Sequence, residues 1–455
     1  MNESRKLAEF VASIHYDQLS AAVVEKAKHC LLDFFANVYG SLQIEAVAKV
    51  LSRYRELGEV GKATVLGAGF TTNLSQAAFL NGVTAEALEA QDGLRFGGNH
   101  PGVAVIPAVL ALAERLDSSG RQVIEAIVAG YEVAGRVAAA AHPHQTLAGF
   151  LPTGSCGALA SAAAASRLLG HAPDLIMHSI GIAGYLAPLS MAEALMGGFT
   201  AKILQGGQAA AAGLAAAEMA DVGITGTPYV LEGSHLKGGF LQITTRSNAD
   251  LNRLTAGLGE MYSIEDIYFK PYTACRHTHG GAQAALALRQ EPGFSVAEIE
   301  AVQVFTYMLG GIAVGKGVDQ QSSFVSAQFS LPYVVAACLI DGDMGPAQFS
   351  AQRVSDETIL ALSRKVAVQP DETLSGMYPE YTASRVEIRL SDGRVLKHQV
   401  DVPKGDPRDP MNADDLTAKL ERFSPAAQKP AAPQVAAKTL ALDEIDHIKN
   451  LTFIV

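Results

Sequence analysis

GALASAAAASRLLG at residues 157–170 and GQAAAAGLAAAEMA at residues 207–220 consist mostly of alanine and glycine. Alanine has the highest intrinsic preference for the helix. Small side chains also let two helix axes approach closely, because little volume separates the backbones. In a globular chain, we expect two such helices to form the tightly packed centre of a helical domain.

Helical periodicity continues before this centre. In residues 20–39 apolar side chains recur at the spacing of one helix face, and residues 121–141 predict a long apolar helix. Residues 175–192 are uncharged over a length that could span a bilayer, but they include a histidine, a proline and several hydroxyls. We therefore expect a buried pair of helices there rather than a membrane span.

The pattern changes near residue 260. Residues 299–308 alternate as a strand does. Residues 384–400 carry Asp392-Gly393 between alternating runs, which is a strong hairpin signal. Residues 326–339 predict a helix between these strands, so this part of the chain mixes helices with a sheet.

The change in pattern predicts two domains. The expected fold class is mainly α, with a large all-helical domain and a smaller α+β lid domain. The helical domain is predicted at residues 1–258 and is completed by residues 404–455, and the lid is predicted at residues 259–403. Residues 424–437 are rich in proline and alanine and predict a loose connection, and residues 440–455 predict a last helix that packs back on the helical domain.

Composition limits the class of partner. The chain has 455 residues, a net charge of −11 and four cysteines that form no CxxC pair. The acidic balance argues against nucleic acid and membranes as partners, since both need a basic surface. Scattered cysteines indicate reduced thiols, and the charged N-terminus has no apolar core of a signal peptide, so we expect a cytoplasmic protein. An acidic protein that binds an acidic small molecule must concentrate positive charge locally.

The glycine-rich stretch EAQDGLRFGGNHPG at residues 89–102 holds Asp92 and His100. Its Gly97-Gly98 pair would let the backbone approach a ligand closely. The alternative is a helix stop followed by a new helix that begins at the proline.

Residues 142–154 (HPHQTLAGFLPTG) carry two histidines and Thr153 just before a predicted helix. Main-chain N–H groups at a helix N-terminus favour an anion, whereas the alternative is an ordinary N-cap. His142 and His144 could bind a metal ion as a pair, but no third ligand follows at an obvious spacing, so we predict no metal site.

Two further groups carry positive charge. Lys202 precedes a Gly-Gly pair at the start of an alanine-rich helix, where a lysine can hold a carboxylate; a merely solvated lysine is the alternative. The densest group is KPYTACRHTH at residues 270–279, which lies where the second domain begins and where clefts form. A surface patch is the alternative there. If Lys270 is a solvated cation, its replacement should slow a reaction and leave folding intact.

These groups, in this order, resemble the MmgE/PrpD family over nearly the whole chain. The matching stretches are DGLRFGGNHPGVAVIPAVLALAER at 92–115, GFLPTGSCGALASAAAASRLLG at 149–170, KILQGGQAAAAGLAAAEMADVGITGTPYVLEG at 202–233, KPYTACRHTHGGAQAAL at 270–286 and SAQFSLPYVVAACLIDGD at 326–343. The resemblance implies a homodimer, a cleft between the two domains, a small polycarboxylate substrate and no cofactor.

The resemblance also implies which residues act. The expected catalytic residues are His100, Asp92, Lys270 and His279. Among the expected substrate-binding residues, the resemblance implies Lys202. The charge and position of the stretches described above add Arg276, His277, Thr153 and His144. We predict that His100 transfers the proton and that the Asp92 carboxylate orients one of the histidines.

Three chemistries are known in this family: dehydration, epimerisation and decarboxylation of small polycarboxylates. Each needs a base near the reacting carbon and cations where charge develops. Leu151 lies where decarboxylase-like and many dehydratase-like members have a histidine, and Phe96 lies where cis-aconitate decarboxylases have a threonine. Both differences weaken the decarboxylase hypothesis most.

We therefore expect a hydro-lyase acting on a hydroxylated di- or tricarboxylate similar to 2-methylcitrate. The main alternative is an epimerase or racemase of a substituted dicarboxylate similar to iminodisuccinate. A cis-aconitate-type decarboxylase and an inactive polycarboxylate-binding scaffold are the remaining alternatives.

Overall fold

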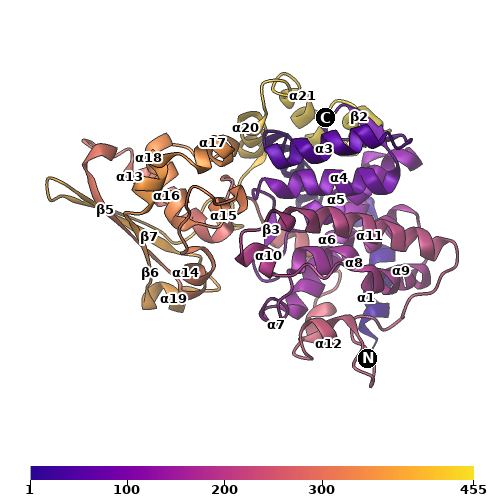
Figure 1. The fold of residues 1–455 in the computed structure, drawn as a ribbon. Coiled ribbons are helices and arrows are strands. Elements are labelled where there is room, and N and C mark those ends of the chain that lie inside the picture. Colours follow the sequence, from indigo (N-terminus) through magenta and orange to yellow (C-terminus); the bar gives the residue numbers. More distant parts are fainter. Residues whose placement is uncertain (1) are drawn as a thin grey trace.

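The computed structural model describes residues 2–455, and its mainly helical architecture confirms the predicted fold class (Figure 1). A large helical body contains both chain termini, and a smaller body carries a four-stranded sheet with helices (Figure 1). One apolar core combines residues between Leu7 and Phe269 with residues between Met411 and Leu451, and a second core lies within 274–400. The C-terminal segment thus packs in the first core, while the predicted domain boundaries themselves stay predictions.

Helices of the large body come from both ends of the chain. They are α1 Glu3–Ser13, α2 Ala21–Ser41, α3 Glu45–Leu57, α4 Leu74–Ala87, α5 Gly102–Leu116, α6 Gly120–Ala141, α7 His144–Leu147, α8 Pro152–Leu168, α9 Pro173–Leu186, α10 Glu193–Met196, α11 Leu204–Asp221, α12 Phe240–Thr244, α20 Ala413–Phe423, α21 Ala432–Leu440 and α22 Lys449–Thr452. A short hairpin, β1 Ala63–Val65 with β2 Phe70–Thr72, was not expected from the sequence.

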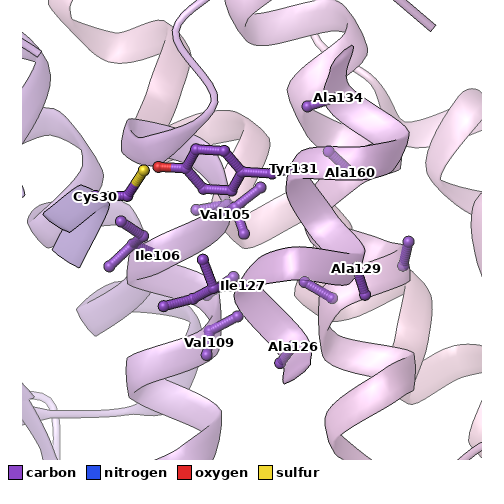
Figure 2. Close-up of a cluster of buried hydrophobic side chains, with 14 of the residues drawn as sticks. Cys30, Val105, Ile106, Val109, Ala126, Ile127, Ala129, Tyr131, Ala134 and Ala160 are labelled. Atoms are coloured by element: carbon purple, nitrogen blue, oxygen red, sulfur yellow. The ribbon is translucent and has the colours of Figure 1, made fainter. Parts of the chain in front are cut away.

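The alanine-rich helices α8 and α11 pack closely, as predicted. A Cβ added at Gly213 of α11 would lie 2.4 Å from the Cβ of Ser161 on α8, so only glycine permits this approach. Figure 2 shows the adjoining core, where Val105 and Ile106 of α5 lie beside Ile127 of α6 and the Tyr131 ring points toward Cys30. These tightly packed helices form a rigid base for the loops between them.

The expected helix pair at residues 175–192 is wrong in its second half. Helix α9 ends at Leu186, and Ala187 is already extended, with φ −57° and ψ 133°. Pro188 is the physical reason, because the residue before a proline is pushed out of the helical region. Among the helices of residues 2–455, none is both long enough and apolar enough to cross a membrane.

The sheet of the smaller body has the strand order β6-β5-β7-β8. Its strands are β5 Ile299–Thr306, β6 Val366–Pro370, β7 Ser384–Leu390 and β8 Val395–Val400. Strands β7 and β8 pair antiparallel from Ser384 with Val400 to Arg389 with Val395, which confirms the predicted hairpin. Strand β6, which runs parallel to β5, was missed.

The smaller body also contains helices. They are α13 His279–Leu288, α14 Met308–Val314, α15 Phe324–Gln328, α16 Leu331–Asp341, α17 Ala351–Val354, α18 Glu357–Ser363 and α19 Glu372–Met377. The helices α13, α14, α16 and α19 pack against strands of the sheet. The single helix predicted at 326–339 is instead two helices, α15 and α16. The break has a local cause, because the Ser330 side chain accepts a bond from Tyr333 N–H and starts α16 as an N-cap.

The C-terminal segment departs from two expectations. The predicted loose connection contains α21, whose Val435 is fully buried, and the predicted last helix is reduced to the short α22. The segment does pack back on the helical body, as expected. Lys419 of α20 forms an ion pair of 2.6 Å with Asp33 of α2, and both side chains are buried.

Candidate active site

A cavity of about 290 Å³ lies where segments of the two bodies meet. Its polar lining residues are Glu89, Arg95, His100, His142, Thr146, Thr153, Lys202, Gln205, Tyr268, Arg276, His277, Tyr378, Thr382 and Asp406. One short antiparallel pair, β3 Gly93–Leu94 with β4 Ile267–Tyr268, joins two of the contributing segments. The chain therefore assembles this cavity from segments that are far apart in sequence.

The structure brings some of the predicted residues together and leaves others outside. His100, Thr153, Lys202, Arg276 and His277 line the cavity. Asp92, Lys270 and His279 are buried and do not line it, and His144 is exposed on α7. Of the two histidines in the HxH pair, His142 is the one in the cavity wall.

His100 is held by two bonds in a tight turn. The turn closes where Gly98, at φ +62°, donates its N–H to the Leu94 carbonyl at 2.9 Å. The main-chain N–H of His100 then donates to Thr153 Oγ1 at 3.1 Å, and its Nδ1 lies 2.6 Å from the Asp92 carbonyl oxygen. A carbonyl can only accept, so Nδ1 carries the proton and Nε2 keeps its lone pair.

The charge state of His100 suits a base. Burial, followed by the positive charge of Lys270, lowers the pKa of His100 to about 3. The ring is therefore neutral near pH 7. A bound substrate with several carboxylates would raise this pKa again, because negative charge stabilises the imidazolium form.

Asp92 orients His100 by a different route from the one predicted. The bond to the imidazole comes from the Asp92 main-chain carbonyl and not from its carboxylate. The carboxyl group instead accepts from Gly102 N–H at 3.1 Å and from the Tyr131 hydroxyl at 2.5 Å. Burial, followed by the nearby Asp33 carboxylate, raises the pKa of Asp92 to about 7. Asp92 thus ties the His100 turn to the first residue of α5.

Two buried lysines share one carboxylate. Lys270 Nζ lies 2.8 Å from Glu89 Oε1 and also donates to the Glu89 carbonyl at 3.1 Å. Lys202 Nζ forms an ion pair with the other Glu89 oxygen and lies 2.6 Å from Glu86 Oε1. Burial alone would raise the pKa of Glu89, but Lys202 and Lys270 outweigh it and hold that pKa well below its usual range.

The expectation that Lys270 is a solvated cation is wrong. Its side chain has no exposed area, and that of Lys202 is 3% exposed. Burial alone would lower the pKa of Lys202, but Glu86 and Glu89 raise it above its ordinary value. Lys202 reaches the cavity as an already paired cation, and Lys270 supports the wall from behind Glu89.

Arg276 is a cation of a different kind. Its guanidinium donates to the Pro403 and Lys404 carbonyls, both at 2.8 Å, and lies 4.9 Å from the centre of the Tyr268 ring. Within residues 2–455, no carboxylate oxygen comes within 4.0 Å of it. A substrate carboxylate would give this buried guanidinium the anionic partner that it lacks.

His277 faces the same cavity from the smaller body. Its Nδ1 is hydrogen-bonded to the Tyr307 hydroxyl, and the Tyr307 ring stacks on Tyr378 with ring centroids 4.8 Å apart. Burial, followed by the charge of Lys270, lowers the pKa of His277 to about 4. His279 is different, because it is fully buried and its Nε2 lies 3.0 Å from the Ala274 carbonyl.

Comparison with known protein families matches two consecutive parts of the chain. Residues 5–251 match the MmgE/PrpD N-terminal domain, and residues 272–441 match the MmgE/PrpD C-terminal domain. This chain belongs to the MmgE/PrpD family. The resemblance inferred from the sequence motifs is thereby confirmed.

Relatives within the MmgE/PrpD family carry two kinds of name. A cis-aconitate decarboxylase of Aspergillus terreus is 26% identical, over 98% of this chain and 94% of that protein. A cis-aconitate decarboxylase of Homo sapiens is 27% identical, over 90% of this chain and 86% of that protein. A 2-methylcitrate dehydratase of Salmonella typhimurium is 24% identical, over 96% of this chain and 94% of that protein.

Several cavity residues of this family member were not predicted as site residues. Glu89, His142, Tyr268 and Asp406 all line the cavity. The sequence contained a signal for Glu89. This carboxylate begins the glycine-rich stretch, and a group of cations that becomes buried needs a negative counter-charge.

Among residues 2–455, no three His, Cys, Asp or Glu side chains are grouped so as to hold a metal ion. Metal-independent activity stays a prediction.

Proposed function

We propose that this chain is a cofactor-free lyase that dehydrates a small hydroxylated di- or tricarboxylate similar to 2-methylcitrate. One observation carries the proposal: a neutral His100 with a free Nε2 lines the same cavity as the Arg276 guanidinium, which has no carboxylate partner among residues 2–455. A base and a carboxylate-binding cation are the two groups that removal of a proton next to a carboxylate requires.

The proposed reaction uses groups on both walls of the cavity. Arg276 binds one substrate carboxylate, and Lys202 lies where further negative charge can be stabilised. His100 Nε2 takes the proton from the carbon beside a carboxylate, and the carbon–oxygen bond of the hydroxyl then breaks. The leaving hydroxyl takes a proton and departs as water. His277 is the proposed donor, because it faces the same cavity from the smaller body.

Both kinds of named relative, decarboxylase and dehydratase, cleave a bond to carbon. Dehydration is the better proposal for this chain because of two positions at which the family resemblance expects other residues. Leu151, which contributes an apolar side chain to the cavity wall, lies where decarboxylase-like and many dehydratase-like members have a histidine. Phe96 lies where cis-aconitate decarboxylases have a threonine, so the two differences together weigh most against decarboxylation.

One observation favours epimerisation as a second candidate. An epimerase needs two bases that reach the same carbon from opposite faces, and this cavity has a neutral histidine on each body, His100 and His277. No leaving group and no acid for it would then be needed. A polycarboxylate-binding scaffold without activity is the remaining alternative.

A substrate panel separates these proposals. The purified protein is incubated with citrate, 2-methylcitrate, cis-aconitate and iminodisuccinate in deuterated water. A rise in ultraviolet absorbance with 2-methylcitrate, from a new conjugated double bond, is expected. Deuterium incorporation without a new product would instead establish epimerisation, and release of carbon dioxide from cis-aconitate would establish decarboxylation. If none of the four acids gives an absorbance change, deuterium incorporation or carbon dioxide, a catalytic role is overturned.

Two further proposals rest on the resemblance to the family and on composition. We propose a homodimer, which light scattering of the purified protein would detect as twice the mass of 47.7 kDa. We also propose a cytoplasmic location, which fractionation of the source cells would test.

A further inference from the structure

A large part of the cavity wall is apolar. Apolar residues of this wall include Leu151, Ala192, Leu195, Met196, Leu309 and Ile312. None of these side chains can donate to or accept from a carboxylate. A small polycarboxylate bound only through His100, Lys202 and Arg276 would leave this part of the wall in contact with water, without a ligand group to cover it.

The helical body supplies one side of this apolar wall. Leu195 and Met196 belong to α10, and the preceding loop is tied to the segment that contains Leu151. Leu151 N–H donates to the Ser190 carbonyl at 2.7 Å, and Ala192 N–H donates to the Gly149 carbonyl at 2.8 Å. These main-chain bonds keep the apolar side chains beside the polar residues that begin α8.

Helix α14 supplies the other side. It carries Leu309 and Ile312, and it packs against the turn Arg276–Thr278 that holds the cationic wall. In Figure 1, α10 and α14 lie on the two bodies near their junction. Leu309 is 43% exposed, Ile312 64% and Met196 53%. The wall therefore contains large apolar side chains that are in contact with water and that a ligand could bury.

We propose that the substrate carries an unbranched alkyl substituent longer than a methyl group, and that Leu195, Leu309 and Ile312 bind it. The inference rests on the proposed function for the polycarboxylate end of the same molecule. An alkyl chain along this wall leaves water, whereas a carboxylate there would lose its hydration without a partner. Each methylene that the wall accepts should improve binding roughly fourfold.

Binding is measured first, with acids that cannot be dehydrated. The intact protein is titrated by calorimetry with a series of 2-alkylsuccinates, from methyl to hexyl. Affinity is expected to rise roughly fourfold per methylene until the cavity is full, and then to fall. An affinity that does not change with chain length would overturn the inference.

Variants of α14 locate the effect. Leu309→Asn and Ile312→Asn should each remove most of the gain with chain length and leave the affinity for methylsuccinate within about twofold, since one polar group interrupts the apolar wall. Met308→Asn is the matched control, because Met308 is 54% exposed on the same helix and does not line the cavity. It should keep the full gain.

A second copy of the chain could cover these side chains instead. In that case Leu309→Asn and Ile312→Asn would convert a dimer into a monomer in light scattering and leave the chain-length dependence as in the wild type, which would overturn the inference. An unchanged mass together with a lost chain-length gain supports it.

Turnover of 2-alkylcitrates then separates the two proposals. A chain-length gain in binding without turnover of any acid would overturn the proposed reaction and leave the apolar subsite standing. Turnover of 2-methylcitrate with no gain for longer chains would support the reaction and overturn the subsite. A parallel rise of affinity and of kcat/KM with chain length supports both.

Discussion

Replacing Lys270 by methionine is expected to destabilise the fold as well as to slow the reaction. Its ammonium has no exposed area, and both of its hydrogen bonds go to Glu89, at 2.8 Å to the side chain and 3.1 Å to the carbonyl. Methionine fills a similar volume but removes the charge. Glu89 now pairs with two lysines, and in the variant it would remain buried with Lys202 alone.

The size of the effect follows from this geometry. Removing one partner of a buried ion pair costs about 3–5 kcal/mol, because the other charge stays out of water. The lower limit, about 3 kcal/mol, applies here since Lys202 still pairs with Glu89. In domains of this size each kcal/mol lowers the melting temperature by roughly 2–4 °C, so a fall of about 6–12 °C is expected.

The variant should also change the pH dependence of the reaction. The charge of Lys270 is one cause of the lowered pKa of His100, which is about 3. Without that charge the pKa rises, so the base becomes protonated at a higher pH. The acid limb of the kcat/KM profile, which reports the free enzyme, should therefore move to higher pH.

Differential scanning calorimetry measures the stability, with Lys397→Met as the matched control. Lys397 is 56% exposed and pairs with Glu387 at 2.9 Å. An exposed pair contributes about 0–1 kcal/mol, so the control should melt within about 4 °C of the wild type. If Lys270→Met melts no lower than Lys397→Met, the assignment of a charged, buried Lys270–Glu89 pair is refuted.

Three further predictions concern the base, a buried carboxyl group and metal. His100→Asn should cut turnover by about a hundredfold, the usual contribution of a general base, with little change in melting temperature. As the control, His144→Asn at an exposed histidine should change neither turnover nor melting temperature. Normal turnover of His100→Asn with a lower melting temperature would show that His100 is a structural residue. Asp92 has a folded pKa of about 7, raised above its unfolded value, so the stability that it contributes should be lost as pH rises from about 4 to 7. Asp92→Asn should therefore remove this contribution from the pH dependence of stability, and a parallel pH dependence in both proteins would contradict this. Dialysis against EDTA should leave activity unchanged, and a lasting loss that one divalent ion restores would show that a metal is required.

Local patterns explain the parts of the fold that were predicted correctly. The helix α2 begins after Ser20, whose side chain accepts from Val23 N–H, and the hairpin of β7 and β8 turns at Asp392-Gly393. These signals depend on residues a few positions apart. The helices that were predicted wrongly also have short-range causes. Pro188 ends the helical conformation after α9, and the N-cap at Ser330 starts a new helix, although the apolar periodicity continues in both places.

The candidate site was predicted less completely, because chemistry and placement are separate properties. The stretch at 270–279 indicated cations near a cleft, and Arg276 and His277 do line the cavity. The same stretch contains Lys270 and His279, which point into the protein. Neighbouring residues on a turn leave the backbone in different directions, so composition alone cannot select among them.

By itself, the sequence determined the family, the mainly helical fold and the kinds of side chain available for binding a polycarboxylate. Alanine content, capping residues and alternation act through neighbours in the chain, so they can be evaluated without a structure. Only the tertiary structure decided which of these side chains meet. Lys270 and Glu89 are 181 residues apart, and their pairing depends on tertiary packing and not on any local preference. Tertiary packing makes Lys270 a buried support, leaves Arg276 without a carboxylate partner among residues 2–455, and places apolar residues of α10 and α14 around one cavity.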